Sequence, residues 1–325
     1  MPWPLLWQAP RRNRCWRGAG TAPYGVGLPM TPADPPRPAG DRPTRGIAVM
    51  LVAVSLFAVQ DTVAKQLTGA YPAVEIAWTR YFFSLVFVLL ALPWLGRKAP
   101  LVSRRPVLQL LRGVFLYTST LFFVLAVSHM PLATATAIGF IAPLLLTALS
   151  IPLLGETVGP RRWAAIAVGF LGMLVIIRPG FGAFDWALLL PVAMACFNAV
   201  YQAVTRLVRG ADPPLTALLY PTAVGCVLGF LPVPFVWVTP APADVLLMAL
   251  MGLCGALSHF CLIRAFALAP ATTLAPFAYS QLVWVALFGY GVFGDIPDLA
   301  TLLGAAVIAA SGLYVFHRER RVKGL

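Results

Sequence analysis

Residues 126–156 read AVSHMPLATATAIGFIAPLLLTALSIPLLGE, and the same pattern returns 139 residues later, where residues 265–295 read AFALAPATTLAPFAYSQLVWVALFGYGVFGD. In each copy a proline opens a long apolar stretch, and a glycine–acid pair closes it where the chain returns to water. The equivalent pairs are Ala126–Ala265, Pro131–Pro270, Thr134–Thr273, Phe140–Tyr279, Gly155–Gly294 and Glu156–Asp295. Because the prolines and terminal acids fall in step, the sequence predicts an internal repeat rather than two helices alike only in composition.

The composition around this repeat indicates an integral membrane protein. Of the 325 residues, 60% are hydrophobic and 11% are charged, against roughly 25% charged residues in an ordinary soluble domain. Charge-free runs extend over residues 113–155 and 213–243, which is more than the ~20 apolar residues that one bilayer crossing needs. A β-barrel is disfavoured, because its strands would read as alternating segments of ~10 residues.

Glycine- and proline-rich turns divide the apolar sequence into ten segments, which predicts an all-α integral membrane fold with ten transmembrane helices. Several connections are very short, so we expect sequential helices to pack as antiparallel neighbours. The expected spans are residues 46–67, 73–95, 106–128, 131–151, 160–178, 184–206, 214–237, 243–266, 271–292 and 298–317.

Four regions are expected along the chain. Residues 1–45 are rich in Pro, Gly and Arg and lack a long apolar run, which predicts a disordered basic leader. Residues 46–180 and 181–317 each hold five spans and form the two repeats. Residues 318–325 form a short basic tail.

The distribution of basic residues predicts the orientation in the membrane. With the N-terminus inside, all but four of the 24 lysines and arginines fall on the cytoplasmic side. The exceptions are Lys65 and Arg178 in outer connections and Arg80 and Arg112 within spans. This asymmetry places both termini of a multi-pass membrane protein in the cytoplasm. Five spans per repeat then make the two repeats inverted, an arrangement common in secondary transporters.

Three stretches of this sequence resemble the EamA family of the drug/metabolite transporter superfamily. They are the repeat quoted above, LGETVGPRRWAAIAVGFLGMLVIIRP at residues 154–179, and RYFFS at residues 80–84. The resemblance covers residues 46–317 and implies a ten-span carrier of small organic metabolites in the cell inner membrane of a bacterium. The amino-acid sequences of the last two stretches are similar to those of riboflavin and S-adenosylmethionine uptake carriers. It therefore implies an aromatic or nucleotide-like substrate, with an amino acid as the alternative.

Two charged residues lie within the apolar spans at the same depth. Asp61 in the first span and Arg80 in the second are each ~9–10 Å below the outer surface at 1.5 Å per residue. We expect them to face each other, because a lone charge in a bilayer is costly. A structural ion pair and a pair that binds substrate or carries protons are equally compatible with this pattern.

A polar face recurs in the second repeat. A shift of 141 residues places Asn198 and Gln202 of the sixth span at the positions of Phe57 and Asp61 in the first. Residues four apart share one face of a helix, so both repeats present a polar face to a common cavity. Interhelical hydrogen bonding is the alternative role for this amide pair.

Other candidate binding residues lie on the eighth span and on the duplicated spans. His259 is central in the eighth span and could carry a proton or pack as a neutral ring. Phe140 and Tyr279 occupy equivalent positions in the repeats and offer rings for stacking, and Gln281 adds an amide. Glu156 and Asp295 end their helices and are expected to be caps or loop anchors.

No cofactor or metal site is expected, because the five cysteines form no CxxC or Cys/His ligand spacing. Enzyme motifs such as GxSxG, a Walker lysine loop or HExxH are absent from the sequence. The expected partners are a small-molecule substrate and the lipid bilayer, with no nucleic acid; a coupling proton and a homodimer remain open. The competing interpretation is a membrane-embedded enzyme or a lipid-handling scaffold.

Overall fold

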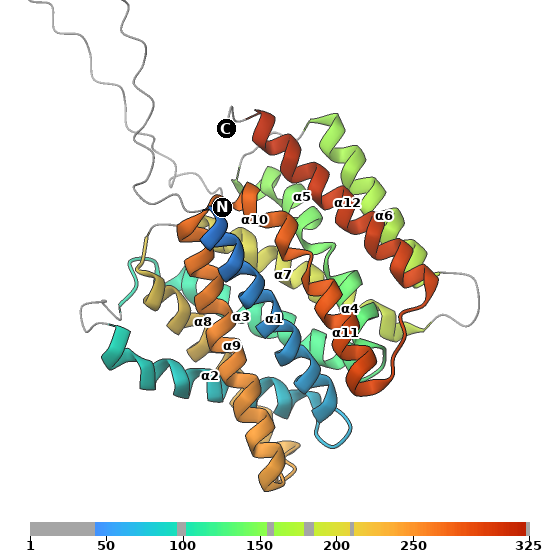
Figure 1. Cartoon of the computed structure of the whole chain (residues 1–325). Helices are drawn as coiled ribbons and strands as arrows, with labels where there is room; N and C mark the ends of the chain where they lie inside the picture. The colour runs from blue at the N-terminus through green and yellow to red at the C-terminus, as the bar shows by residue number, and fades with distance from the viewer. Residues whose placement is uncertain (1–42, 96–101, 155–158, 179–184, 209–210, 323–325) are drawn as a thin grey trace, which may run out of the picture. The chain divides into compact units, whose positions relative to one another are not determined.

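The computed structural model describes residues 43–95, 102–154, 159–178, 185–208 and 211–322. The expected leader, except for its last three residues, and the Gly155–Glu156 pair lie outside this part. Within it, the chain forms α-helices joined by short turns (Figure 1). The helices are α1 (Pro43–Leu67), α2 (Ala73–Leu95), α3 (Pro106–Val127), α4 (Leu132–Gly139), α5 (Ala142–Leu154), α6 (Pro160–Ile177), α7 (Leu189–Leu207), α8 (Pro214–Phe230), α9 (Pro242–Leu268), α10 (Ala271–Ala278), α11 (Gln281–Phe293) and α12 (Leu299–Val322), with short 3-10 helices at Trp186–Leu188 and Val233–Phe235.

The expected all-α membrane fold with ten spans is confirmed. In the described part of the chain, nine spans are long and apolar enough to cross a bilayer, and the slightly shorter apolar helix Leu299–Val315 supplies the tenth. The leader, the tail and the seventh span differ from expectation: α8 ends at Phe230, whereas the seventh span was expected to continue to residue 237. Residues 43–45 belong to α1 rather than to the leader, and α12 continues to Val322, into the expected tail.

The fourth and ninth spans are each interrupted, which the sequence analysis did not anticipate. α4 gives way to α5 after Phe140, and α10 gives way to α11 after Tyr279. At both points the backbone bonds shorten to three residues, from Ile141 N to Ile138 O (3.1 Å) and from Ser280 N to Phe277 O (3.2 Å). Such a 3-10 turn inside a helix often marks a functional hinge.

Different local chemistry produces the two interruptions. Pro143 has no N–H to donate to the carbonyl of Gly139, so the α-helical ladder cannot pass through Ile141 unchanged. In the second copy, the Ser280 hydroxyl donates to the carbonyl of Phe277 at 2.6 Å. This bond competes with the main-chain ladder at the same turn.

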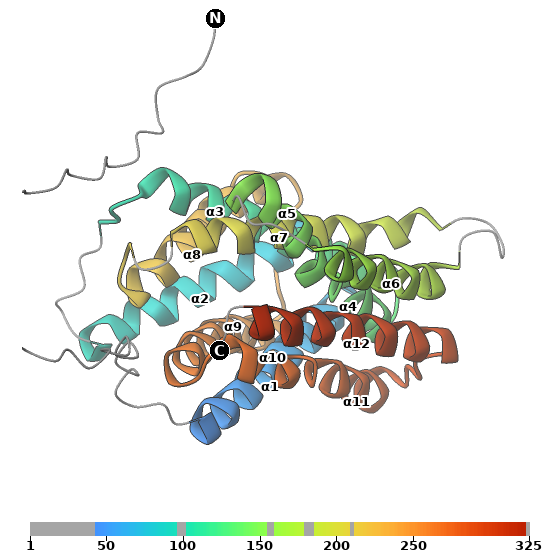
Figure 2. The same cartoon turned by 90° about the horizontal axis from the view of Figure 1, so that it is seen from above.

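Helix packing follows the repeat. α1 packs on α9 as its counterpart α7 packs on α3, and α1 meets α10 and α11 as α7 meets α4 and α5. The pairs α2–α8 and α6–α12 join equivalent helices of the two repeats. Seen from above, α3, α5 and α7 lie on one side, and α1, α9 and α10 on the other (Figure 2). The expectation that sequential helices pack together is therefore wrong for most pairs, because the main contacts run between the repeats.

Contacts between loops show which helix ends lie together at each end of the bundle. Ser103, before α3, bonds to Asp212, before α8, at the end of the bundle where α1 begins, here called the Pro43 end. Lys65, near the end of α1, pairs with Asp295, after α11, at the opposite Leu67 end. Spans alternate between these ends, so α1 and α7 run in opposite directions. The two five-span repeats are inverted, as expected.

Candidate functional site

A polar contact joins the first helix to the interrupted ninth span. Gln281, the first residue of α11, donates through Nε2 to Oδ2 of Asp61 at 3.2 Å. Asp61 is only 7% exposed, and Gln60 Nε2 lies 3.5 Å from its other oxygen. The interruption after Tyr279 therefore places an amide donor beside a buried acid of the other repeat. Asp61 and Gln281 are two of the eight residues expected to bind substrate.

The expected direct ion pair between Asp61 and Arg80 is not formed. Their charges lie close enough to interact, but no hydrogen bond or ion pair joins these two described residues. The reason is the order of packing: α9 lies against both α1 and α2, while α1 and α2 share almost no packing with each other. The acid and the guanidinium thus face the same region without neutralising each other directly.

Gly255 of α9 is the point where the three helices meet. A Cβ at Gly255 would lie 2.5 Å from Gln60 Oε1 of α1 and 3.0 Å from Ser84 Oγ of α2. The Ser84 hydroxyl also donates to the carbonyl of Gly252 on α9 at 2.7 Å. Only a residue without a side chain lets both polar groups approach this closely. Gln60 is fully buried, and its Oε1 has no partner among the described residues.

His259 lies one turn further along α9. Its Nδ1 is 2.9 Å from the carbonyl of Gly255, and its ring meets Phe57 of α1 edge-on, with centroids 5.0 Å apart. Arg80 and Arg112 both lie within electrostatic range of the ring. The ring is therefore packed against Phe57 and the Gly255 carbonyl, and both roles considered for it remain predictions.

The amide pair on α7 interacts within its own helix. Gln202 Nε2 donates to Asn198 Oδ1 at 2.6 Å, so this bond does not connect two helices. The structure shows no direct bond from either amide to Asp61, Arg80 or His259 in the part of the chain it describes. Their expected contribution to the site stays a prediction.

Phe140 and Tyr279 meet where the two interrupted spans bend. Their ring centroids are 5.1 Å apart at an interplanar angle of 35°. Tyr279 is 8% exposed, its hydroxyl has no partner among the described residues, and it contacts the backbone position of Gly312 on α12. The structure brings this pair together but shows no direct contact from it to the Asp61 cluster.

Arg112 is a candidate that the sequence analysis noted only for its charge. It is 7% exposed within α3, and its guanidinium donates to Gln109 Oε1 (3.0 Å) and to the carbonyl of Ala217 (2.9 Å), with Tyr201 OH at 3.4 Å. Its Nε has no partner in the described chain. The available signal was an arginine inside an apolar span, which in membrane proteins is a functional candidate by default.

A hydrogen-bonded network connects Arg112 to the Pro43 end. Gln109 also donates to Asp212 at 2.8 Å, and the Arg104 amide donates to the same carboxylate at 2.8 Å. These bonds hold the pKa of Asp212 below its usual value, because each of them stabilises the ionised form. The Ser103 hydroxyl has the largest effect, and the Arg104 and Gln109 donors add to it. Asp212 thereby anchors the start of α3.

The Leu67 end is closed by contacts between the repeats. Lys65 pairs with Asp295, and its ammonium lies 4.8 Å from the centre of the Phe293 ring. Asp295 is thus a loop anchor, as expected. Nearby, Tyr71 donates to Asp244 at 2.7 Å, and this bond raises the pKa of the phenol because it stabilises the protonated form. These ties join α1 to the α11–α12 turn and to the start of α9.

The described helices therefore place the Asp61 carboxylate, the Gln60 and Gln281 amides and the His259 imidazole about the contact of α1 with α9, with the two guanidiniums within electrostatic range of the imidazole. Groups of three or more His, Cys, Asp or Glu that could hold a metal do not occur among the described residues. These side chains carry charge and can donate and accept hydrogen bonds. It presents no nucleophile paired with a base at the residues described above.

Comparison with known proteins identifies the same architecture. The profile of the EamA-like transporter family matches twice, over residues 44–178 and 185–316. An S-adenosylmethionine uptake transporter of Rickettsia prowazekii is 28% identical over 277 residues, which cover 85% of this chain and 94% of the relative. A riboflavin transporter of Rhizobium johnstonii is 31% identical, covering 85% of this chain and 92% of the relative.

Two more comparisons extend this picture. The pseudopaline exporter CntI of Pseudomonas aeruginosa is 26% identical, covering 82% of this chain and 94% of its own length. A solved crystal structure superimposes with a TM-score of 0.60 at 19% identity and covers 86% of this chain and 99% of its own. At that identity the structural likeness supports the fold alone.

Proposed function

The chain belongs to the EamA-like transporter family, and from this premise we propose that it is a secondary carrier that moves a small organic metabolite across the cell inner membrane by alternating access. The inverted repeats support this mechanism, because two similar halves that face opposite ways can rock about a site between them. The positive-inside distribution supports a cytoplasmic location for both termini.

One observation carries the proposal: Gln281, beside the interruption of the ninth span, holds Asp61 of the first helix. Interrupted helices at the interface of inverted repeats are where carriers of this kind bind substrate. An ionisable residue buried in a membrane span carries a free-energy cost, which favours a functional role for Asp61. Asp61, Arg80 and His259 therefore form the centre of the proposed binding site, with Gln281 as its link to the second repeat.

The charges favour a zwitterionic substrate. The charges of Asp61 and Arg80 lie within electrostatic range of each other, but the two side chains do not pair directly. An α-amino-carboxylate placed between them would satisfy both, with its ammonium on Asp61 and its carboxylate on Arg80. Of the substrates named for the relatives, S-adenosylmethionine carries such a group, whereas riboflavin does not. We therefore rank S-adenosylmethionine and related amino-acid conjugates first, with riboflavin-like heterocycles second.

The test is counterflow in proteoliposomes. Vesicles loaded with unlabelled S-adenosylmethionine should accumulate labelled S-adenosylmethionine, and S-adenosylhomocysteine should compete. 5′-Methylthioadenosine, which lacks the amino acid group, should compete poorly. Asp61→Asn should reduce counterflow, whereas Asp298→Asn, which changes an exposed acid at the Leu67 end, should not.

Other outcomes separate the alternatives. Counterflow with riboflavin but not with S-adenosylmethionine would support a carrier function and would contradict our ranking of zwitterionic substrates above riboflavin-like heterocycles. Binding of a metabolite without counterflow, or its chemical conversion, would instead support the membrane-embedded enzyme or scaffold. We propose that the protein is not an enzyme, since its connections are short and its sequence contains none of the catalytic motifs sought.

A further inference from the structure

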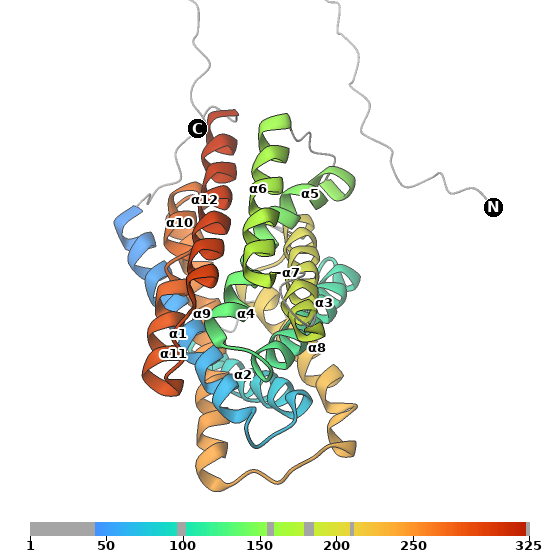
Figure 3. The same cartoon turned by 90° about the vertical axis from the view of Figure 1, so that its right-hand side faces the viewer.

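α6 and α12, the last spans of the two repeats, pack against each other along one side of the bundle (Figures 1 and 3). Their backbones come close at Gly172 and Gly304, where a Cβ on Gly172 would lie 3.0 Å from the Gly304 carbonyl. Towards the Pro43 end the same two helices leave a groove with a volume of about 440 Å³.

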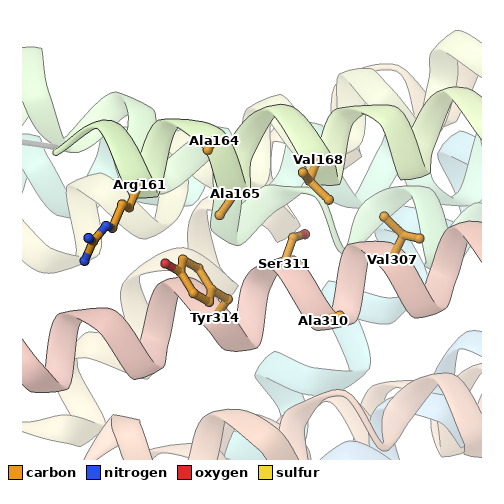
Figure 4. Close-up of a pocket in the computed structure, with 8 residues that line it drawn as sticks. All are labelled: Arg161, Ala164, Ala165, Val168, Val307, Ala310, Ser311 and Tyr314. Atoms are coloured by element: carbon orange, nitrogen blue, oxygen red, sulfur yellow. The ribbon is translucent and has the colours of Figure 1, made fainter.

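The groove is apolar along its length and polar at one end. Its walls come from both helices and consist of Ala164, Ala165, Val168, Val307 and Ala310. Ser311 also lines it, but the Ser311 hydroxyl is already bonded to the carbonyl of Ile308 at 2.9 Å. Arg161 and Tyr314 lie together at the end nearest the start of α6 (Figure 4).

This groove opens on the outside of the bundle. Val168 is 47% exposed and Tyr314 is 44% exposed, so the groove faces the surroundings of the spans rather than the site between the repeats. Arg161 is the second residue of α6 and therefore lies at the membrane surface. Val168 lies seven positions further along α6, which places the apolar walls up to ~10 Å deeper in the bilayer.

Arg161 has no hydrogen bond or ion pair in the part of the chain that the structure describes, and its side chain is exposed. An unpaired guanidinium at the head of an apolar groove favours an anionic group attached to a hydrocarbon chain. Basic pockets between spans on the cytoplasmic side bind lipid headgroups in this way.

We propose that the α6–α12 groove binds an anionic phospholipid, with an acyl chain between the alanine and valine walls and the phosphate held by Arg161 and Tyr314. A second copy of the chain fits less well. In a two-fold contact within one membrane, groove would face groove, and each Arg161 would approach the same end of its partner. Like charges would meet, and nothing would fill the hollow.

Lipid titration monitored by native mass spectrometry tests the charged end. Phosphatidylglycerol should bind the detergent-purified protein more tightly than phosphatidylcholine does, and Arg161→Gln should weaken phosphatidylglycerol binding about fivefold or more. Arg264→Gln is the matched control, because it removes an exposed arginine from the Pro43 end of α9, outside the groove, and should leave binding unchanged. Equal loss in both variants, or equal affinity for the two lipids, would overturn the proposal.

A second variant tests the apolar walls. Ala310→Phe fills the groove while keeping Arg161, and it should also weaken phosphatidylglycerol binding. Leu171→Phe changes a lipid-facing residue of α6 outside the groove and should have no effect. A third variant, Ala164→Cys in a background without other cysteines, tests whether two copies meet at the groove. If these single cysteines form disulfides between copies in membranes, the groove is an interface between copies, and the lipid proposal is wrong.

Discussion

The rings of Phe140 and Tyr279 lie 5.1 Å apart, centroid to centroid, and each residue ends the first half of an interrupted span. The two residues occupy equivalent positions in the duplicated sequence. Their contact therefore lies where the two-fold relation between the repeats brings the interruptions together. Because the rings are in contact, a displacement of α4 or α10 would change the packing of the other interrupted span.

Removal of either ring should weaken substrate binding. Phe140→Ala and Tyr279→Ala are expected to reduce affinity about tenfold, because stacking area is lost at the junction of the repeats, while the protein still reaches the membrane. The measurement is substrate binding to purified protein, with thermal unfolding alongside. Unchanged affinity with a loss of about 3–5 kcal/mol in stability would identify both rings as core residues.

Tyr279→Phe separates the hydroxyl from the ring. The hydroxyl has no partner among the described residues, so its removal should leave the melting temperature unchanged. A drop in affinity in this variant would show that the hydroxyl contacts substrate. A large loss of stability would contradict the structure, because it would require a bond that the described residues do not make.

Asp61 and Arg80 are predicted to act on substrate rather than to hold α1 and α2 together. Asp61→Asn and Arg80→Gln should each reduce transport at least tenfold, because each removes a charge proposed to hold the substrate. Each should also lower expression, because the remaining charge loses its electrostatic neighbour in the bilayer, at a cost of about 2.5–3.5 kcal/mol on insertion scales. The double variant should regain normal expression and remain inactive. Recovery of transport in the double variant would show a purely structural pair, and wild-type transport in both single variants would remove these residues from the site.

The Leu67 end is expected to alternate between a closed and an open state during transport. Lys65 and Asp295 join the two repeats there, so this contact must separate if substrate is to reach the site from that side. In a cysteine-free background, Lys65→Cys with Asp295→Cys bridged by a bis-methanethiosulfonate, which forms a disulfide with each thiol, should stop counterflow, and a reductant that cleaves these disulfides should restore it. Either single cysteine treated in the same way is the control. Full activity of the bridged protein would show that this end does not open.

Asp212→Asn should destabilise the protein in a pH-dependent manner. The pKa of Asp212 is lowered in the folded state, mainly by the Ser103 hydroxyl. The stability it provides is therefore fully present above the unfolded-state value near 4 and is lost as the pH falls through the lower folded-state value. The variant should melt roughly 2–4 °C below wild type at pH 7, and the difference should shrink below about pH 4. A difference that persists at low pH would assign the effect to packing.

The orientation is tested by labelling single cysteines in intact cells. Position 241, in the turn before α9, should react with a membrane-impermeant reagent from outside, whereas position 320 should react only after permeabilisation. This result follows from the asymmetry of lysine and arginine along the sequence. The reverse pattern would overturn the predicted orientation of both termini.

The amino-acid sequence determined the properties that follow from local composition and periodicity. The number of spans, the duplication and the inverted arrangement all depend on where apolar segments begin and end and on the placement of basic residues. Asp61, Arg80 and His259 could be selected as candidates because polar groups stand out within apolar helices. The depth of each followed from its distance to the end of its span.

Only the tertiary structure decided which of these residues meet. Equal depth in the first two spans suggested that Asp61 would reach Arg80, but α9 packs against both helices, and Gly255 gives both α1 and α2 a close approach to it. Asp61 instead bonds to Gln281, which lies 220 positions later in the sequence. The interruption of the ninth span sets the position of that amide, and it depends on one short hydrogen-bonded turn. Contacts of this kind depend on long-range packing, which neither hydropathy nor residue spacing encodes.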